Sequence, residues 1–258
     1  CGSLNEVRCK MPSTISAGDI PTYTGDGSST SVPPWLSGVS STGTFYTNAD
    51  ANWPSGASGI PENWTRVNER EKDDITKPLT FKATQDGSKV TLEKNNSPSG
   101  SFQTSRDGGN TWEDYTLNTD IALNTGDEVS FRAKADRTSA QNANNYFYFR
   151  MGGKIEAWHN VMSLYRTNDF ATHESVVDYA FARMFLCCDS LTKAPVFPAT
   201  TLADSCYWAM FASCFSLTEA PELPATTLAV DCCYGMFRNC FSLVNAPALP
   251  ATTLDGRY

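Results

Sequence analysis

Apolar and polar residues alternate along the middle of the chain. Successive side chains of a β-strand point to opposite faces of a sheet, so alternation at period two predicts strands with one buried face. The pattern occurs in LTFKAT, SKVTLEK, SFQTSRD, NTWEDYTL, EVSFRAKA and NYFYFRM, between Leu79 and Met151. Stretches rich in Gly, Asn, Asp and Ser separate these segments. The sequence therefore predicts an antiparallel β-sandwich over 79–166.

The C-terminal third, 167–258, has a different pattern, because it repeats itself every 26 residues. Equivalent positions carry the same residue type: Met184, Met210 and Met236; Cys188, Cys214 and Cys240; Leu191, Leu217 and Leu243. In each unit, apolar residues at helical spacing, as in ADSCYWAMFASC, predict a short helix, and the Pro-containing SLTEAPELP predicts a short strand. A Thr-Thr pair precedes each predicted helix and can cap it. We expect such units to stack, because one unit cannot bury its apolar face alone.

The repeated motif MFxxCxSLTxAPxLPATTL resembles the BspA-like leucine-rich repeats of bacterial surface proteins. The resemblance covers about 176–258 and implies an extracellular, right-handed solenoid that contacts a host or neighbouring cells. The fold class expected for the chain is therefore α+β: a β-sandwich beside a helix–strand leucine-rich-repeat solenoid.

The first four residues, CGSL, match the Cys-x-Ser-Leu element of the repeats. We therefore interpret Cys1 as a repeat cysteine rather than the lipidated cysteine of a lipoprotein. The Trp-, Gly- and Ser-rich segment 35–67 resembles the cap that closes such arrays. The expected domains are a repeat fragment with its cap (1–70), a charged linker (71–78), the sandwich (79–166) and the repeats (167–258). Two alternatives stay open: the chain is cut from a longer protein, or 1–70 caps the repeats of 176–258 through a gap or a neighbouring molecule.

Composition excludes several classes of function. The formal net charge is -8 with 20 Lys+Arg, which disfavours nucleic-acid backbones and anionic membrane surfaces. No run of 18 apolar residues occurs, so no membrane-spanning segment is expected.

Candidate chemistry is sparse. The two histidines, His159 and His173, lack metal-ligand spacing, and no G-x-S-x-G, P-loop or H-E-x-x-H motif occurs. We therefore expect no catalytic residue, metal or cofactor. SRDGGNTW (105–112) fits the Asp-box of sialidases, but a single copy favours a structural turn. The nine cysteines are expected to be mainly buried free thiols, with disulfides and metal ligation as alternatives.

Recognition is expected on repeat positions that vary between units, because conserved repeat positions build the core. The candidate binding residues are Trp208, Phe215, Phe241, Lys193, Glu219 and Asn245. We expect a non-enzymatic adhesion or ligand-binding protein of the bacterial cell surface, with a host or neighbouring-cell protein or glycan as partner. Alternatives are an architectural module that self-associates head to tail through its repeat ends, and a carbohydrate-binding accessory protein.

Overall fold

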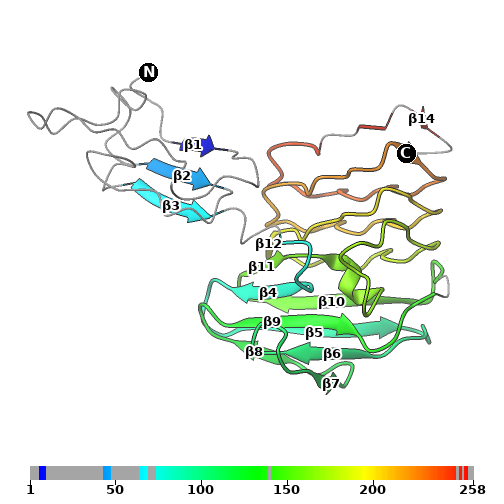
Figure 1. Cartoon of the computed structure of the whole chain (residues 1–258), viewed down its shortest axis with the longest axis horizontal. Coiled ribbons are helices and arrows are strands. Elements are labelled where there is room, and N and C mark those ends of the chain that lie inside the picture. Colours follow the sequence, from blue (N-terminus) through cyan, green and yellow to red (C-terminus); the bar gives the residue numbers. More distant parts are fainter. Residues whose placement is uncertain are drawn as a thin grey trace, which may run out of the picture. The chain divides into compact units, whose positions relative to one another are not determined.

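The computed structural model describes residues 6–9, 43–47, 64–68, 74–138, 141–247, 250–251 and 253–254. The chain forms two compact units, Cys1–Asp73 and Asp74–Tyr258. The division falls inside the charged segment 71–78. Each unit is described by itself (Figure 1).

The N-terminal unit contains a parallel three-stranded sheet. Its strands are β1 (Glu6–Cys9), β2 (Gly43–Thr47) and β3 (Trp64–Asn68), in that order across the sheet. Their register places Glu6 opposite Thr44, and Gly43 opposite Trp64. The predictions for Cys1 and for most of the cap segment lie outside the described residues.

The second unit begins with a sandwich of two sheets. The larger sheet has the order β12-β11-β4-β9-β6-β7 and the smaller one β10-β5-β8. The strands are β4 (Thr80–Ala83), β5 (Ser88–Asn95), β6 (Phe102–Ser105), β7 (Glu113–Tyr115), β8 (Ile121–Leu123), β9 (Glu128–Ala133), β10 (Tyr146–Gly152), β11 (Ile155–Trp158) and β12 (Leu191–Lys193). A four-residue 3₁₀ helix, η4 (Val161–Leu164), follows β11, with Asn160 as its N-cap.

The six strands predicted between Leu79 and Met151 are confirmed as β4, β5, β6, β7, β9 and β10. Their buried faces meet in an aromatic core between the two sheets. Phe81 on β4 and Phe131 on β9 both contact Phe149 on β10 edge to face, at ring-centroid distances of 4.7 and 5.2 Å. Edge-to-face packing brings the positive ring edge onto the negative ring face, which adds to the benefit of burial.

The predicted helix–strand leucine-rich-repeat solenoid is wrong. In the described residues of the repeats there is no α-helix, and the segments expected to be helical are strings of turns. Within each of these turn segments, residues at intervals of four adopt a left-handed conformation, with φ between 50° and 63°. No α-helix tolerates this conformation. These residues are Tyr179, Arg183 and Cys187; Ser205, Ala209 and Ser213; Asp231, Gly235 and Asn239.

The hydrogen bonds of these turn segments explain why a helix does not form. Alternate amides donate within the unit to the carbonyl three residues before, as Met210 does to Tyr207 over 3.1 Å. The amides between them donate to the carbonyl 25 residues later, as Phe211 does to Met236 over 2.9 Å. A helix would direct every amide along its own axis. The 26-residue period instead supplies an acceptor in the next unit, so half of the amides cross between units.

Two further ladders join consecutive units. Thr201 bridges Ser175 and Thr227 in parallel register, and β13 (Thr227–Leu228) pairs with β14 (Thr253–Leu254). The Thr-Thr pairs therefore lie in bridges between units and are not helix caps. On another side, the Val244 amide donates to the Thr218 carbonyl over 3.1 Å. The result is a stack of units, 175–254, whose described residues contain no helix; we call it the repeat stack.

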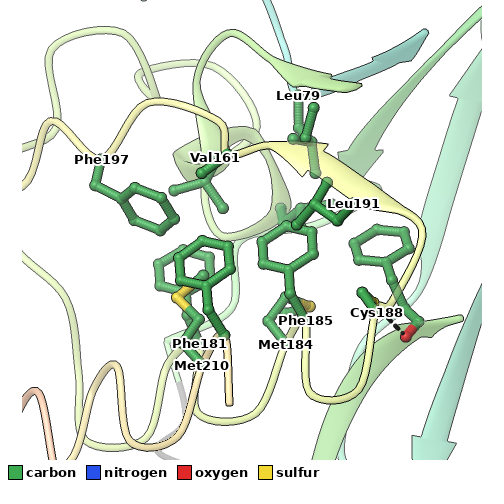
Figure 2. Packing of buried hydrophobic residues seen from close by; sticks show 14 of the residues in the cluster. Leu79, Val161, Phe181, Met184, Phe185, Cys188, Leu191, Phe197 and Met210 are labelled. Atoms are coloured by element: carbon green, nitrogen blue, oxygen red, sulfur yellow. Dashed lines mark hydrogen bonds between the residues drawn. The ribbon is translucent and has the colours of Figure 1, made fainter. Parts of the chain in front are cut away.

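The repeat stack continues the core of the sandwich. Phe185 stacks on Phe149 at 5.5 Å, Phe211 on Phe185 at 5.2 Å and Phe237 on Phe211 at 5.7 Å. Figure 2 shows the start of this shared core, where Phe181, Phe185 and Met210 approach Leu79 and Val161. Strand β12 of the first unit also pairs in parallel with β11 of the sandwich. The two parts are therefore built on one continuous core.

Candidate ligand-binding groove

The outer face of the small sheet forms a groove of about 520 Å³. Strand alternation explains its floor: Phe147 and Phe149 point into the core, so Tyr146, Tyr148 and Arg150 face outwards. The full lining is Lys89, Thr91, Glu93, Asp120, Tyr146, Tyr148, Arg150, Met151, Leu186 and Cys187. We call it the tyrosine groove. Its volume lies in the range of small-ligand sites, roughly 300–1,000 Å³.

Antiparallel register arranges the charged groups of the groove in two sets. Tyr148 lies opposite Glu93 across β10 and β5, and its hydroxyl donates to a Glu93 carboxylate oxygen over 2.6 Å. Arg150 binds the other oxygen of Glu93 over 3.2 Å. The hydrogen bond from Tyr148 to Glu93, helped by partial burial, raises the pKa of Tyr148. The phenol therefore stays protonated and holds the Glu93 carboxylate in place.

The second set is centred on Asp120. Lys89 and Thr91, both on β5, donate to its two carboxylate oxygens over 2.8 and 2.6 Å. These two hydrogen bonds lower the pKa of Asp120. A general acid needs a raised pKa, so Asp120 is suited to accept hydrogen bonds rather than to transfer a proton. Lys89 pairs with Asp120, and Arg150 pairs with Glu93, so the formal charges of these four side chains cancel.

An aromatic strip extends from the groove onto the repeat stack. The Arg183 guanidinium lies between two rings, 5.1 Å from the Tyr146 centroid and 4.4 Å from the Trp208 centroid. Tyr179 meets Trp208 edge to face at 6.0 Å. Arg183 is itself held by the Ala143 carbonyl, to which it donates over 3.0 Å. The strip therefore joins the sandwich and the repeat stack on one surface.

The candidate binding residues predicted on the repeats fall into four groups. Trp208 belongs to the aromatic strip beside the tyrosine groove. Phe215 and Phe241 stack on each other at 5.7 Å and are 44% and 80% exposed. Lys193 lies over the Trp158 ring at 4.4 Å, whereas Glu219 and Asn245 form a parallel bridge.

Sequence reasoning missed the groove itself. The alternation in NYFYFR already identifies Tyr146, Tyr148 and Arg150 as one outward face. The partners Glu93 and Asp120 depend on strand register, which a local pattern does not specify.

The Asp-box segment forms the expected structural turn. Gly108 and Gly109 have φ of 72° and 95°. Asp107 accepts hydrogen bonds from the Thr111 amide and hydroxyl over 2.9 and 2.7 Å, and these bonds lower its pKa. The Trp112 indole donates to the Gly109 carbonyl over 2.9 Å. The Asp107 carboxylate and the Trp112 indole N–H therefore both hold the turn.

The seven cysteines from Cys187 to Cys240 are free thiols. Three of them form a regular series, because Cys188, Cys214 and Cys240 donate to the carbonyls of Phe149, Phe185 and Phe211 over 3.0–3.1 Å. Figure 2 draws the first of these bonds. Burial raises the pKa of Cys188 and Cys214. Among the described residues, no three His, Cys, Asp or Glu side chains lie close enough together to hold a metal ion.

In the part of the chain that the structure describes, no helix has the length and apolar character to cross a membrane. No family model, curated protein or solved structure matches this chain. The resemblance to BspA-like proteins therefore stays a prediction.

Proposed function

We propose that the chain is a non-enzymatic binding module whose tyrosine groove holds a neutral glycan. The observation that carries the proposal is the pairing of two outward tyrosine rings with two charge-compensated carboxylates in one groove. An aromatic ring offers a flat apolar surface to the C–H face of a sugar ring. Carboxylates, guanidinium and ammonium groups meet the hydroxyl groups around it.

The charge balance of the groove favours a neutral ligand. Glu93 and Asp120 are each matched by a cation, Arg150 and Lys89 respectively. A strongly anionic or cationic ligand would lose its water without meeting a net opposite charge. A hydroxyl-rich neutral ligand can instead bind oxygen and nitrogen atoms that the existing hydrogen bonds already hold in position. An extracellular, cell-surface location remains part of this proposal.

The test is titration of the purified chain with a panel of neutral oligosaccharides and mucin glycans, followed by calorimetry. Tyr148→Ala is expected to weaken binding about tenfold or more, since removal of one ring contact costs roughly 1.4 kcal/mol. Tyr148→Phe keeps the ring but loses the bond to Glu93, so a smaller loss is expected. The double variant Phe215→Ala/Phe241→Ala removes exposed aromatic rings elsewhere and is the matched control. If no panel member binds, or if Tyr148→Ala binds as the unmodified chain does, the groove is not a glycan site.

A second candidate rests on the stacked and exposed rings of Phe215 and Phe241. Aromatic residues are enriched at the centres of protein interfaces. In this alternative the repeat stack binds a partner protein. Binding that is lost in the Phe215/Phe241 double variant and kept in Tyr148→Ala would favour it over the glycan groove.

A further inference from the structure

At the C-terminal end of the repeat stack, a regular set of backbone N–H groups has no acceptor among the residues that the structure describes. In the second unit, the amides of Ala209, Phe211 and Ser213 donate to carbonyls of the third unit over 2.7–2.9 Å. The equivalent amides of the third unit belong to Gly235, Phe237 and Asn239. They find no acceptor among the residues that the structure describes. By the same period, Asp231 and Cys233 would donate to positions 256 and 258, which lie outside the described residues.

The apolar side chains at this end are also incompletely covered. Phe211, Cys214 and Leu217 of the second unit are 0% exposed. The equivalent residues of the third unit are Phe237, Cys240 and Leu243, and all are only partly buried. Two further side chains are largely open to solvent, Phe241 at 80% and Val244 at 77%. Each of these less buried side chains lies where a following unit would cover it. The exposed end of the third unit therefore has the same surface that the first and second units each bury against the next unit.

The polarity of this end restricts what can bind there. The carbonyls of Met236 and Arg238 already accept from Phe211 and Ser213. The turn segment therefore presents mainly N–H groups, and two such ends cannot pair with each other. At the opposite end of the stack, Phe149 donates to Met184 and covers the first unit. In a second copy, that end of the stack is therefore already occupied by its own β10.

We propose that this end, defined by Gly235, Phe237, Asn239, Cys240 and Leu243, docks a further polypeptide segment of the same 26-residue pattern. Such a segment brings carbonyls at every second position, a phenylalanine to stack on Phe237 and another to stack on Phe241. Its cysteine thiol donates to the Phe237 carbonyl, as Cys240 does to Phe211. The partner is therefore recognised by backbone register and ring stacking rather than by charge. This inference does not depend on the glycan groove.

The experiment is hydrogen exchange of the full chain in the presence of a peptide with the sequence of residues 203–228. Docking is expected to slow exchange at the Gly235, Phe237 and Asn239 amides by about tenfold or more. Amides of Tyr234 and Arg238, which are bonded within their own unit, are internal references and change less. A peptide carrying Phe211→Asp is the matched control and should give no protection.

A second form of the experiment joins the added unit covalently to the chain, so that docking too weak for the free peptide can still be detected. The sequence of residues 207–228 is appended after Tyr258, which preserves the 26-residue register, and a second extension carries Phe211→Asp. Protection of the three amides by the free peptide at about 1 mM, or by the tethered unit, supports the proposal. Absence of protection in both, or equal protection by the Phe211→Asp versions, overturns it.

Discussion

The amide of Phe149 donates to the carbonyl of Met184 over 2.7 Å. Phe185 and Phe211 make the same bond to Met210 and Met236 in the units that follow. Strand β10 thus occupies the place of a preceding repeat unit and covers the first unit of the stack.

This shared register predicts that the sandwich and the repeat stack unfold together. Phe149→Ala opens a cavity between both sheets and the first unit, and we expect it to cost about 3–5 kcal/mol of the free energy of unfolding. Urea denaturation followed by tryptophan fluorescence and circular dichroism should give coincident transitions that shift together. Phe241→Ala, at an exposed ring, is the control and should change stability by roughly 0.5 kcal/mol or less. Two separate transitions would contradict a common folding unit.

A buried arginine also joins the two parts. Arg137 is 6% exposed, and its guanidinium donates to the carbonyls of Leu164 and Ala180 over 3.0 and 3.3 Å. Burial lowers its pKa to about 10. Arg137→Ala removes the side-chain donor of the Leu164 carbonyl, whereas the Ala180 carbonyl still accepts from Gln141. It also removes the guanidinium that lies 5.2 Å from the Phe147 ring centroid, so we expect a loss of about 3 kcal/mol.

Arg150→Ala is the matched control in the same denaturation assay. Its side chain is 70% exposed and pairs with Glu93 at the surface, so its removal should cost roughly 1 kcal/mol or less. Equal losses for Arg137→Ala and Arg150→Ala would refute a structural role for the buried guanidinium.

The lowered pKa of His159 leads us to expect that the stability of the chain depends on pH. Burial, assisted by the positive charge of Lys77, lowers its pKa below the usual 6.5. Above pH 6.5 the imidazole is neutral in both the folded and the unfolded chain, so it has no effect. Below that pH the unfolded chain binds a proton first, so the free energy of unfolding falls as the pH falls. Denaturation midpoints between about pH 7 and pH 5 measure this slope.

The matched variant is His159→Asn. Asparagine tolerates the left-handed backbone at this position, where φ is 66°. We expect the slope above about pH 5 to flatten in this variant. A variant with an unchanged slope would show that another group titrates in this range.

Cysteine reactivity offers a probe of the groove. Cys187 is exposed and lines the tyrosine groove, whereas its neighbour Cys188 is buried with a raised pKa. We expect iodoacetamide to modify Cys187 in the folded chain and Cys188 only after unfolding. Fragment-resolving mass spectrometry distinguishes the two. A glycan in the groove should slow modification of Cys187; an unchanged rate at saturating glycan would speak against binding in the groove.

The sandwich strands could be predicted because each carries enough alternating residues to define two faces. The additional strand Ile121–Leu123 has only three residues. Strand β7 is equally short, but it lies inside the longer patterned stretch NTWEDYTL. The turn segments were mistaken for helices because Tyr207, Met210, Phe211 and Cys214 have helical spacing. The bonds that override helix formation reach 25 residues along the chain, beyond any local window.

One local signal did exist in the third unit. Asp231, Gly235 and Asn239 recur every four residues, and all three types accept left-handed backbone readily. The first unit has Tyr179, Arg183 and Cys187 at these positions, which hides the signal. The outward tyrosines were likewise readable, but their pairing with Glu93 across β5 and β10 required the register of the folded sheet.

The constant offset between donor and acceptor in the repeat stack also restricts how such a protein can change over evolutionary time. An insertion or deletion inside a turn segment would misalign every later amide of that unit with its acceptor and would separate the phenylalanine rings. Loss or gain of a whole unit preserves all of these relations. Lineages carrying this architecture are therefore expected to differ in length by complete duplications, with small insertions confined to the connections between turn segment and strand.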